Sequence, residues 1–400
     1  MKKILCVFTI CLTLVGFAQK KPSNINHGQI SQKHYHDTIA YKMFKDKMLV
    51  PVIIEGKSYT FLFDTGAPFS LSKALYQEFK PDIIDVIDVH DASGNVAAIN
   101  IVSLPKLQLG ALTFEDTPGF LLQQNAEVYF QCIGIDGIIG SNMLRNSVVQ
   151  IDDQKKHIII TDKAKNLEIN TEFYSTMELS KTQSNPFIHI KLEKGEASAA
   201  DRVLFDTGAD DFYAMSKKAC QYFEEKTDVL DVLAKANGAN SWGMHGFAKK
   251  NEKLILKIPK MIINTEVFKD VFVNTTTSNE SRFGAKVLSF GKVTLDYDKQ
   301  RFYFDSYDLV DLRTFVKPPF VVQPTMKDEQ LVVGIIWDET LSEQVKLGDY
   351  ILKVNEFSYE DKNFCELVVH QNDDIGDEIV MTLKDMDTGE IKTVTVGRLK

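Results

Sequence analysis

The chain carries one apolar strand-and-turn sequence twice. Both 61-FLFDTGAPFS-70 and 204-LFDTGADDFY-213 run from apolar residues into Asp-Thr-Gly, and Asp206 follows Asp64 by 142 residues. Three further blocks match in the same order, 72–79 with 216–223, 104–120 with 258–274 and 138–160 with 282–304. The offset stays between 142 and 154 residues, which small insertions explain. This internal repeat predicts two copies of one structural design.

Each copy has the pattern of a β structure with one or two short helices. Ser72 and Ser216 are good N-cap residues, and each precedes an amphipathic stretch. Segments 86–100 and 234–250 each read as a hairpin, suited to cover a cleft. Alternating or β-rich runs predict strands at 49–56, 58–63, 148–152, 157–161, 187–193, 253–258 and 293–298.

The duplication suggests a chemistry for Asp64 and Asp206. If the copies pack about a pseudo-twofold axis, these two aspartates face each other. Carboxylates about 3 Å apart repel by roughly 5 kcal/mol at an effective dielectric of ~20, so the pair would hold one proton between them. One carboxylate could then activate a water while the other protonates a carbonyl oxygen or leaving amine. This chemistry requires neither a metal nor a cofactor.

The neighbouring residues fit that role. Gly66 and Gly208 allow a tight turn in which backbone amides approach the carboxylate. Thr65 and Thr207 supply hydroxyls that could bond across the axis and lock the two loops together. The apolar residues before each aspartate predict a buried and rigid base.

The bare triplet is a weak signal. A third Asp-Thr-Gly, at 387–389, lies in the polar segment 385-DMDTGE-390 between two predicted strands. It has no apolar strand directly before it, so it reads as an ordinary hairpin turn. The preceding strand and the repeated frame therefore carry the prediction, rather than the triplet.

With these motifs, the chain resembles the aspartic proteases, in the retropepsin-like, two-lobed form related to the pepsin-like enzymes and found in exported bacterial proteins. The matching residues are 63-FDTGA-67, 205-FDTGA-209 and the apolar-apolar-Gly element 138-IIG-140. The resemblance covers about residues 46–308. It implies lobes at 46–165 and 166–310, each a closed barrel, with hairpin flaps over a peptide cleft.

The sequence differs from the pattern of pepsin-type lobes in three features. Arg282 stands where the first copy has Ile138, which bears on the packing behind Asp206. Ala67 and Ala209 follow the glycines, where pepsin-type lobes have a hydroxyl residue that bonds the carboxylate. Without that hydroxyl the pKa should be higher, which predicts an optimum at weakly acidic to neutral pH. Neither flap segment carries the tyrosine of pepsin-type flaps; Trp242 is a possible substitute or a packed core aromatic.

The C-terminal part has a different character. The segment 317-KPPFVVQP-324 is suited to a domain boundary. Beyond it, strands are expected at 331–337, 378–385 and 391–396, with a helix at 361–371. The segment 346-KLGDYILKVNEFSY-359 resembles PDZ domains, which implies an α+β domain over 318–400 that binds peptide C-termini by strand addition. The expected carboxylate-binding loop, 319–322, has no glycine, so a structural or substrate-presenting role is an equal alternative.

The N-terminus reads as an export signal. A basic start and the apolar run 4-ILCVFTICLTLVGFA-18 predict a signal peptide at 1–18, followed by a lead segment at 19–45. No other segment is long enough to span a membrane, so we expect an exported protein, periplasmic or extracellular, with no span in the mature chain. The remaining cysteines, Cys132, Cys220 and Cys365, are expected as buried free thiols.

The sequence therefore predicts an exported aspartic endopeptidase with a peptide or protein substrate and Asp64 and Asp206 as its catalytic residues. A net charge of −9 without a basic stripe argues against a nucleic-acid partner. Two alternatives stay open: an inactive peptide-binding scaffold that keeps the protease fold, and a hydrolase of non-peptide amides.

Overall fold

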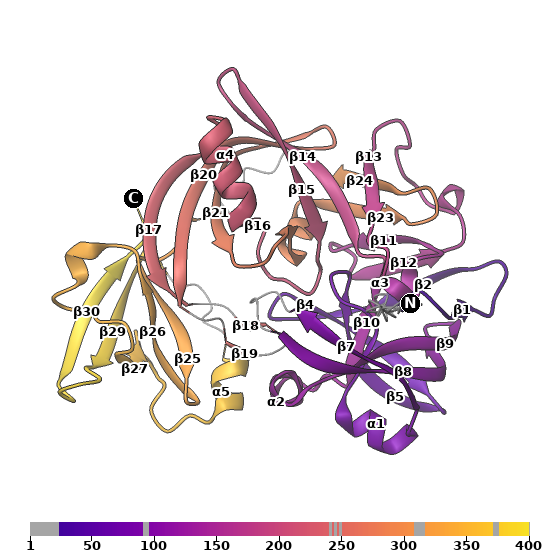
Figure 1. Cartoon of the computed structure of the whole chain (residues 1–400), viewed down its shortest axis with the longest axis horizontal. Coiled ribbons are helices and arrows are strands. Elements are labelled where there is room, and N and C mark those ends of the chain that lie inside the picture. Colours follow the sequence, from indigo (N-terminus) through magenta and orange to yellow (C-terminus); the bar gives the residue numbers. More distant parts are fainter. Residues whose placement is uncertain are drawn as a thin grey trace, which may run out of the picture.

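The computed structural model describes residues 24–90, 96–239, 242–243, 246–247, 250–307, 317–370 and 376–399. The chain is mainly β, as the sequence predicts, and forms two barrels, a sheet shared between them and a smaller C-terminal sheet (Figure 1). The predicted signal peptide lies outside the described residues. Among the residues that are described, no helix is long and apolar enough to cross a membrane.

The first barrel closes on itself. Its six strands follow the order β9-β6-β10-β5-β4-β8, and β8 pairs again with β9 to complete the ring. The strands are β4 (Lys47–Ile54), β5 (Lys57–Asp64), β6 (Ser70–Leu71), β8 (Val96–Leu109), β9 (Leu112–Leu121) and β10 (Gly137–Gly140). Helices α1 (Lys73–Phe79), α2 (Gln124–Cys132) and α3 (Ser141–Leu144) flank it.

The second barrel repeats this arrangement strand for strand. Its order is β21-β16-β22-β15-β14-β20, and β20 pairs again with β21 to complete the ring. The elements are β14 (Pro186–Lys194), β15 (Ala197–Phe205), β16 (Tyr213–Ser216), α4 (Lys217–Lys226), β20 (Asn251–Ile263), β21 (Glu266–Thr276), β22 (Ser281–Phe283) and the 3₁₀ helix η2 (Ala285–Ser289). The predicted duplication is therefore confirmed at the level of topology.

The N-cap predictions are also confirmed. The hydroxyl oxygen of Ser72 accepts a hydrogen bond from Leu75 N at the start of α1, and that of Ser216 accepts one from Ala219 N at the start of α4. These contacts satisfy amide groups that the first turn of a helix leaves without partners. The two helices thus begin at equivalent positions of the repeat.

A six-stranded sheet joins the two barrels. Its order is β13-β24-β23-β11-β12-β2, with β11 paired antiparallel to β23 at the centre. Gln150 lies opposite its repeat equivalent Thr294 and donates a 3.0 Å hydrogen bond to its hydroxyl, so the pseudo-twofold axis passes between them. The strands are β2 (His36–Ala40), β11 (Val148–Asp152), β12 (His157–Thr161), β13 (Ser175–Leu179), β23 (Gly291–Asp296) and β24 (Arg301–Ser306).

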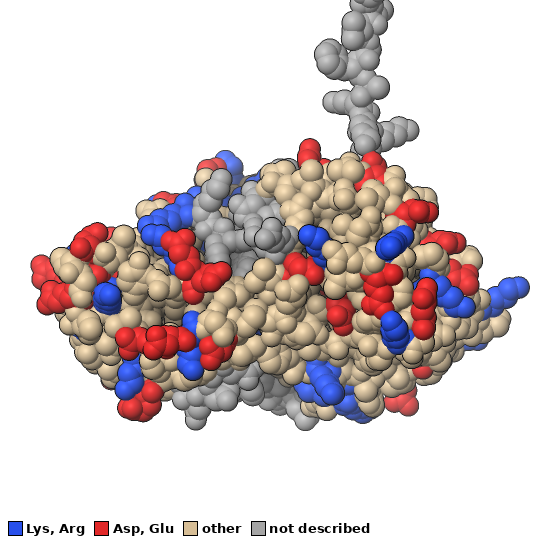
Figure 2. Space-filling view, turned by 90° about the horizontal axis from the view of Figure 1, so that it is seen from below, with Lys and Arg blue, Asp and Glu red and all other residues tan. Residues whose placement is uncertain are grey.

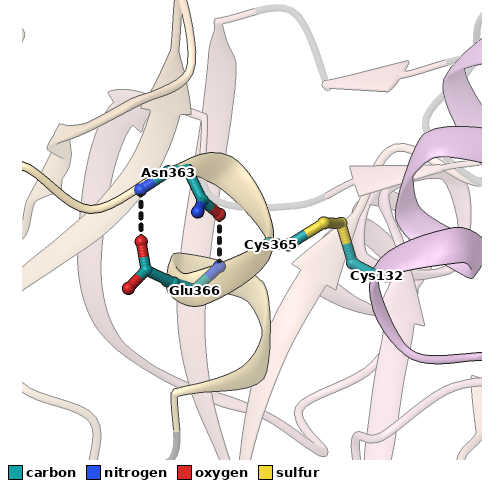
Figure 3. The surroundings of a disulfide bond; sticks show 4 residues. All are labelled: Cys132, Asn363, Cys365 and Glu366. Carbon is teal, nitrogen blue, oxygen red and sulfur yellow. Dashed lines mark hydrogen bonds between the residues drawn. A yellow bond between two sulfur atoms is a disulfide. The ribbon is translucent and has the colours of Figure 1, made fainter.

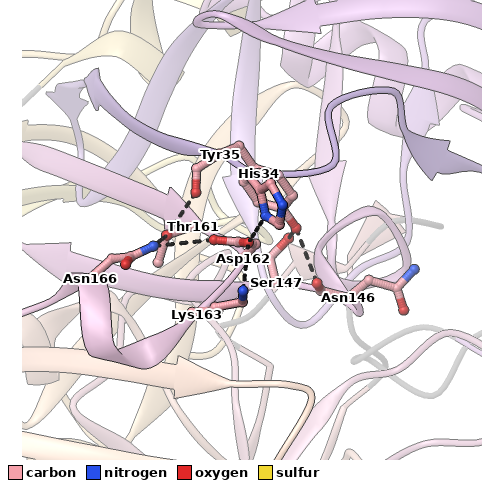
Figure 4. A network of polar contacts seen from close by, with 8 residues as sticks. All are labelled: His34, Tyr35, Asn146, Ser147, Thr161, Asp162, Lys163 and Asn166. Atoms are coloured by element: carbon pink, nitrogen blue, oxygen red, sulfur yellow. Dashed lines mark hydrogen bonds and ion pairs between the residues drawn. The ribbon is translucent and has the colours of Figure 1, made fainter.

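The segment predicted as a lead is built into this fold from residue 24 onward. Strand β1 (Gln29–Ile30) pairs with β9, β2 forms the edge of the shared sheet beside β12, and β3 (Lys42–Phe44) pairs with β4. Beside β2, Tyr35 donates to Asn146 O and its own carbonyl accepts from Thr161, while His34 contacts Asp162 (Figure 4). Strand β2 thus occupies the place that β13 holds in the second copy.

Both predicted cover segments form hairpins. Strand β7 (Asp82–His90) pairs with β8, and β17 (Asp231–Gly238) pairs with β20. Residues 91–95, at the tip of the first hairpin, lie outside the described residues. Within the second, the backbone of β18 (Trp242–Gly243) pairs with β19 (Gly246–Phe247), and the side chain of Trp242 is not described.

The C-terminal module, defined here as residues 317–399, forms its own sheet in the order β25-β26-β27-β29-β30. The predicted turn at Asp387 is confirmed, because β29 and β30 pair on either side of it and the Asp385 carboxylate accepts the amides of Asp387 and Thr388. The elements are β25 (Val322–Lys327), β26 (Gln330–Ile336), β27 (Tyr350–Val354), β28 (Phe357–Ser358), α5 (Phe364–Val369), β29 (Glu378–Lys384) and β30 (Ile391–Gly397).

The prediction of three free thiols is wrong for two of them. Cys132 at the end of α2 and Cys365 in α5 form a disulfide, whereas Cys220 is free and buried. The paired cysteines are separated by 233 residues, and they meet only because α5 of the C-terminal module lies against α2 (Figure 3). Sequence spacing cannot reveal a pairing that depends on the docking of two domains.

The surface is mixed in charge. On the part of the face that Figure 2 displays in colour, acidic and basic side chains are interspersed. This agrees with the absence of a basic stripe in the sequence.

Candidate active site

The fold brings Asp64 and Asp206 together at the axis between the barrels. Asp64 is the last residue of β5, Asp206 follows β15, and only 9% of Asp64 is exposed. A Cβ atom on Gly66 would overlap the carboxyl group of Asp206, and one on Gly208 would overlap that of Asp64. Glycine is therefore required in both turns, because each backbone lies directly against the carboxylate of the other copy.

The two aspartate loops are held to each other by a symmetric set of hydrogen bonds. Thr65 N donates to Thr207 Oγ1 at 3.0 Å, and Thr207 N donates to Thr65 Oγ1 at 3.1 Å. Each hydroxyl in turn donates to a backbone carbonyl of the opposite copy, that of Thr65 to Phe205 O and that of Thr207 to Phe63 O. Both threonines are fully buried. The predicted contact across the axis is confirmed.

Backbone amides orient the carboxylates, but not equally. Oδ1 of Asp64 accepts from Gly66 N at 2.8 Å and from Ala67 N at 3.1 Å. Oδ1 of Asp206 accepts from Gly208 N at 3.0 Å, while Ala209 N donates to the backbone carbonyl of Asp206. Burial, followed by the nearby charge of Asp206, raises the pKa of Asp64 above its ordinary range, although the Gly66 amide and Lys47 oppose the shift.

A second layer supports each loop from below. Strand β10 runs parallel to β5 with Gly140 beside Asp64, and Ser141 N donates to Ala67 O. In the second copy Ala285 N donates to Ala209 O in the same way. The Ser141 hydroxyl also donates to Thr65 O at 2.6 Å. These contacts fix the turn geometry from strands that are themselves buried.

Two residues that the sequence did not single out also join the copies. Leu49 pairs with Leu62 in the first copy and Phe187 pairs with Leu204 in the second, so Lys47 and Asn185 occupy equivalent positions. Lys47 Nζ donates to Gly208 O at 2.6 Å, and Asn185 Nδ2 donates to Gly66 O at 2.7 Å. Each side chain therefore holds the aspartate loop of the opposite copy. Strand register reveals this equivalence, whereas the drifting offset hides it in the sequence.

Lys47 also introduces a charge that its counterpart lacks. Burial lowers its pKa, but the carboxylates of Asp210, Asp206 and Asp64 raise it by more, so Lys47 stays a cation. In return Lys47 lowers the pKa of Asp210. The Asp64–Asp206 pair, called the dyad below, thus lies in an asymmetric electrostatic field, with a fixed cation on the side of the Gly208 carbonyl.

The departure at Arg282 has a local explanation. In the first copy Leu62 and its strand partner Ile138 are buried beneath the segment that contains α2. In the second copy the corresponding pair is Leu204 and Arg282, and the connection between β21 and β22 is the short segment 277–280. Because that connection contributes no covering helix, a charged side chain is tolerated there. The guanidinium lies 3.6 Å from the Asp211 carboxylate.

Comparison with known proteins agrees with this geometry over part of the chain. Residues 50–143, which contain Asp64 and its supporting strands, match the family model described as aspartyl protease. No curated protein matches the chain. Among solved structures, the aspartic proteinase from Irpex lacteus superposes with a TM-score of 0.43 at 12% identity, covering 68% of this chain and 97% of that one.

Proposed function

We propose that the chain is an exported aspartic endopeptidase in which Asp64 and Asp206 together hydrolyse peptide bonds. The observation that supports this most directly is the close reciprocal approach of each Asp-Thr-Gly turn to the carboxylate of the other copy. The aspartyl protease match over residues 50–143 points the same way. Two buried aspartates need either a nearby counter-charge or a shared proton. The close approach of these two carboxyl groups suits a shared proton.

The asymmetry of the site suggests how the proton is distributed. Oδ1 of Asp64 already accepts two amide hydrogen bonds, so the shared proton belongs on its Oδ2. Asp206, as the carboxylate, would take a proton from the attacking water while Asp64 gives its proton to the carbonyl oxygen. Asp206 then gives its proton to the leaving amine while Asp64 takes one from a hydroxyl of the geminal diol, so the C–N bond breaks, the acid is released and the dyad is again singly protonated.

Export is supported by two independent features. The N-terminal 18 residues have the composition of a signal peptide. The Cys132–Cys365 disulfide is of the kind that persists in oxidising compartments, such as the periplasm or the extracellular space.

The test is cleavage of a mixed peptide library by the Gln19–Lys400 protein. Asp64→Asn and Asp206→Asn should each lower the rate by about 10²–10⁴-fold, because each removes one partner of the acid–base pair. Asp387→Asn is the matched control, since it changes the same triplet in a hairpin turn of the C-terminal module, and its rate should equal that of the wild type.

Three outcomes would contradict the proposal in different ways. Cleavage that survives both dyad substitutions would exclude these aspartates as the catalytic pair. Saturable peptide binding without cleavage would favour the inactive scaffold. Turnover of small amides but not of peptides would point to the non-peptide hydrolase.

A further inference from the structure

The C-terminal module makes a close backbone contact with the second barrel. Ala239 N, just beyond β17, donates a 3.0 Å hydrogen bond to Gly334 O in β26. A Cβ atom on Gly238 would overlap that same carbonyl, and one on Gly334 would overlap the carbonyl of Ala239. Two glycines thus allow the end of β17 to lie directly against β26.

Apolar packing extends this contact. Ile255 of β20 is fully buried within the core cluster of the C-terminal module, together with Val333 and Ile335 of β26. Partly buried side chains of β17 pack on the same cluster, namely Leu233, Ala234 and Ala236. The hairpin of β17 and β20 therefore supplies part of the module's hydrophobic core, so the module is docked rather than merely tethered.

A second attachment joins the module to the first barrel. Helix α5 lies against α2, and the Cys132–Cys365 disulfide links them covalently (Figure 3). Lys45 donates from Nζ to the carbonyls of Val368 and His370 at the C-terminal end of α5, where a cation is favourable. An Asn363–Glu366 capping box fixes the other end of the helix.

The attachment to the first barrel lies close in sequence to a residue that holds an aspartate loop. Lys45 lies at the β3–β4 turn, two residues before Lys47, which holds Gly208 of the second aspartate loop. On the other side, the hairpin of β17 and β20 is the repeat counterpart of the β7–β8 hairpin. The module therefore connects the two barrels a second time, independently of the shared sheet, as Figure 1 shows on the left of the molecule.

We propose that the C-terminal module is an internal strap that limits how far the two barrels separate at the dyad. The module packs against the second barrel through the contact of β17 with β26, and the Cys132–Cys365 disulfide bonds it covalently to the first barrel. Strand β26 is thereby engaged by the chain's own β17 at Gly334, so the module holds the second barrel in place relative to the first. Loss of either attachment should therefore release the restraint on the separation of the two barrels.

The experiment measures the separation of the barrels without relying on catalysis, so its outcome is independent of the proposed function. Spin labels on non-cysteine unnatural residues replace the exposed Gln77 of α1 and Gln221 of α4 in the full exported chain. The wild type should give one narrow distance distribution. Cys132→Ser combined with Cys365→Ser should broaden it toward longer distances, whereas Cys220→Ser, which removes the free thiol, should leave it unchanged.

A second variant separates loss of the strap from unfolding of the module. Gly238→Ala disturbs the β17–β26 contact while keeping the disulfide, and it should broaden the distribution in the same direction. Hydrogen exchange reports whether β29 and β30 remain protected in each variant. Equal distributions in the wild type and both variants, with β29 and β30 protected, would overturn the proposal.

Discussion

The outer faces of the two aspartate loops differ, although the loops themselves are nearly superimposable in their contacts. In the first copy, Ile138 is covered by the segment containing α2, and that segment extends the molecule toward the C-terminal module through Cys132. In the second copy, a four-residue connection leaves room for the Arg282–Asp211 pair. The contacts at the axis are thus alike in the two copies. The outer faces differ, with the α2 segment in the first copy and the Arg282–Asp211 pair in the second.

The comparison also separates symmetric from asymmetric parts of the site. The threonine contacts obey the pseudo-twofold axis, since a bond in one direction has its mate in the other. The pair formed by Lys47 and Asn185 obeys the axis in geometry but not in charge. The symmetric contacts therefore hold the loops, and the charge difference between Lys47 and Asn185 makes the electrostatics of the site asymmetric. The following predictions test these statements.

The largest expected effect concerns two equivalent buried side chains beside the shared sheet. Tyr41 and Met177 are equivalent, because Tyr41 N donates to Lys156 O and Met177 N donates to Gln300 O, and both are buried. Tyr41→Ala and Met177→Ala should each lower the free energy of unfolding by about 2–5 kcal/mol in urea titrations. A chain that starts at Lys42 and keeps the wild-type stability would show instead that residues 24–41 are a removable segment.

The threonine bonds should give the next effect. Thr65→Val and Thr207→Val each leave a buried amide and a buried carbonyl without partners, which costs about 1–3 kcal/mol apiece. The double variant should cost less than the sum of the two single variants, because both hydroxyls hold the same two loops together and the first substitution already loosens them. Urea unfolding measures this cycle, with Thr38→Val on the exposed edge of β2 as control. Simple additivity would contradict a coupled pair of loops.

The smallest expected effect is a shift of the pH–rate profile. In the proposed mechanism the dyad carries one proton, and Lys47 favours its ionised forms, so Lys47→Asn should raise the pKa values that bound the pH–rate profile by up to about one unit. The active window then moves to higher pH. Asn185→Lys adds a cation at the equivalent position and should move it to lower pH. Opposite or absent shifts in both variants would contradict the role of this charge.

The raised pKa of Asp64 also makes the free energy of unfolding depend on pH. Because the pKa of Asp64 is raised in the folded state, its protonated form contributes stability that is present at low pH and lost as pH rises through the folded pKa. A pH–rate profile that peaks below about pH 3 would contradict the raised pKa of Asp64 and the expected weakly acidic to neutral optimum.

Local patterns were enough to predict much of this structure. Alternation and apolar runs predicted the strands around each aspartate, and Ser72 and Ser216 marked the helix starts because capping is a local contact. The repeat predicted that Asp64 and Asp206 would face each other if the two copies pack about a pseudo-twofold axis. The Asp-Thr-Gly turn at Asp387 could be told apart from those at Asp64 and Asp206 because no apolar strand directly precedes it.

Other features were decided only by the tertiary structure. The sequence by itself determined the duplicated β design, the turn chemistry of the aspartate loops and the candidate pair. Tertiary packing decided that Cys132 meets Cys365, that Lys47 and Asn185 reach across the axis, and that β26 lies against β17. The physical reason is that these contacts join residues far apart in the chain, whose proximity depends on how whole domains dock and not on any local preference.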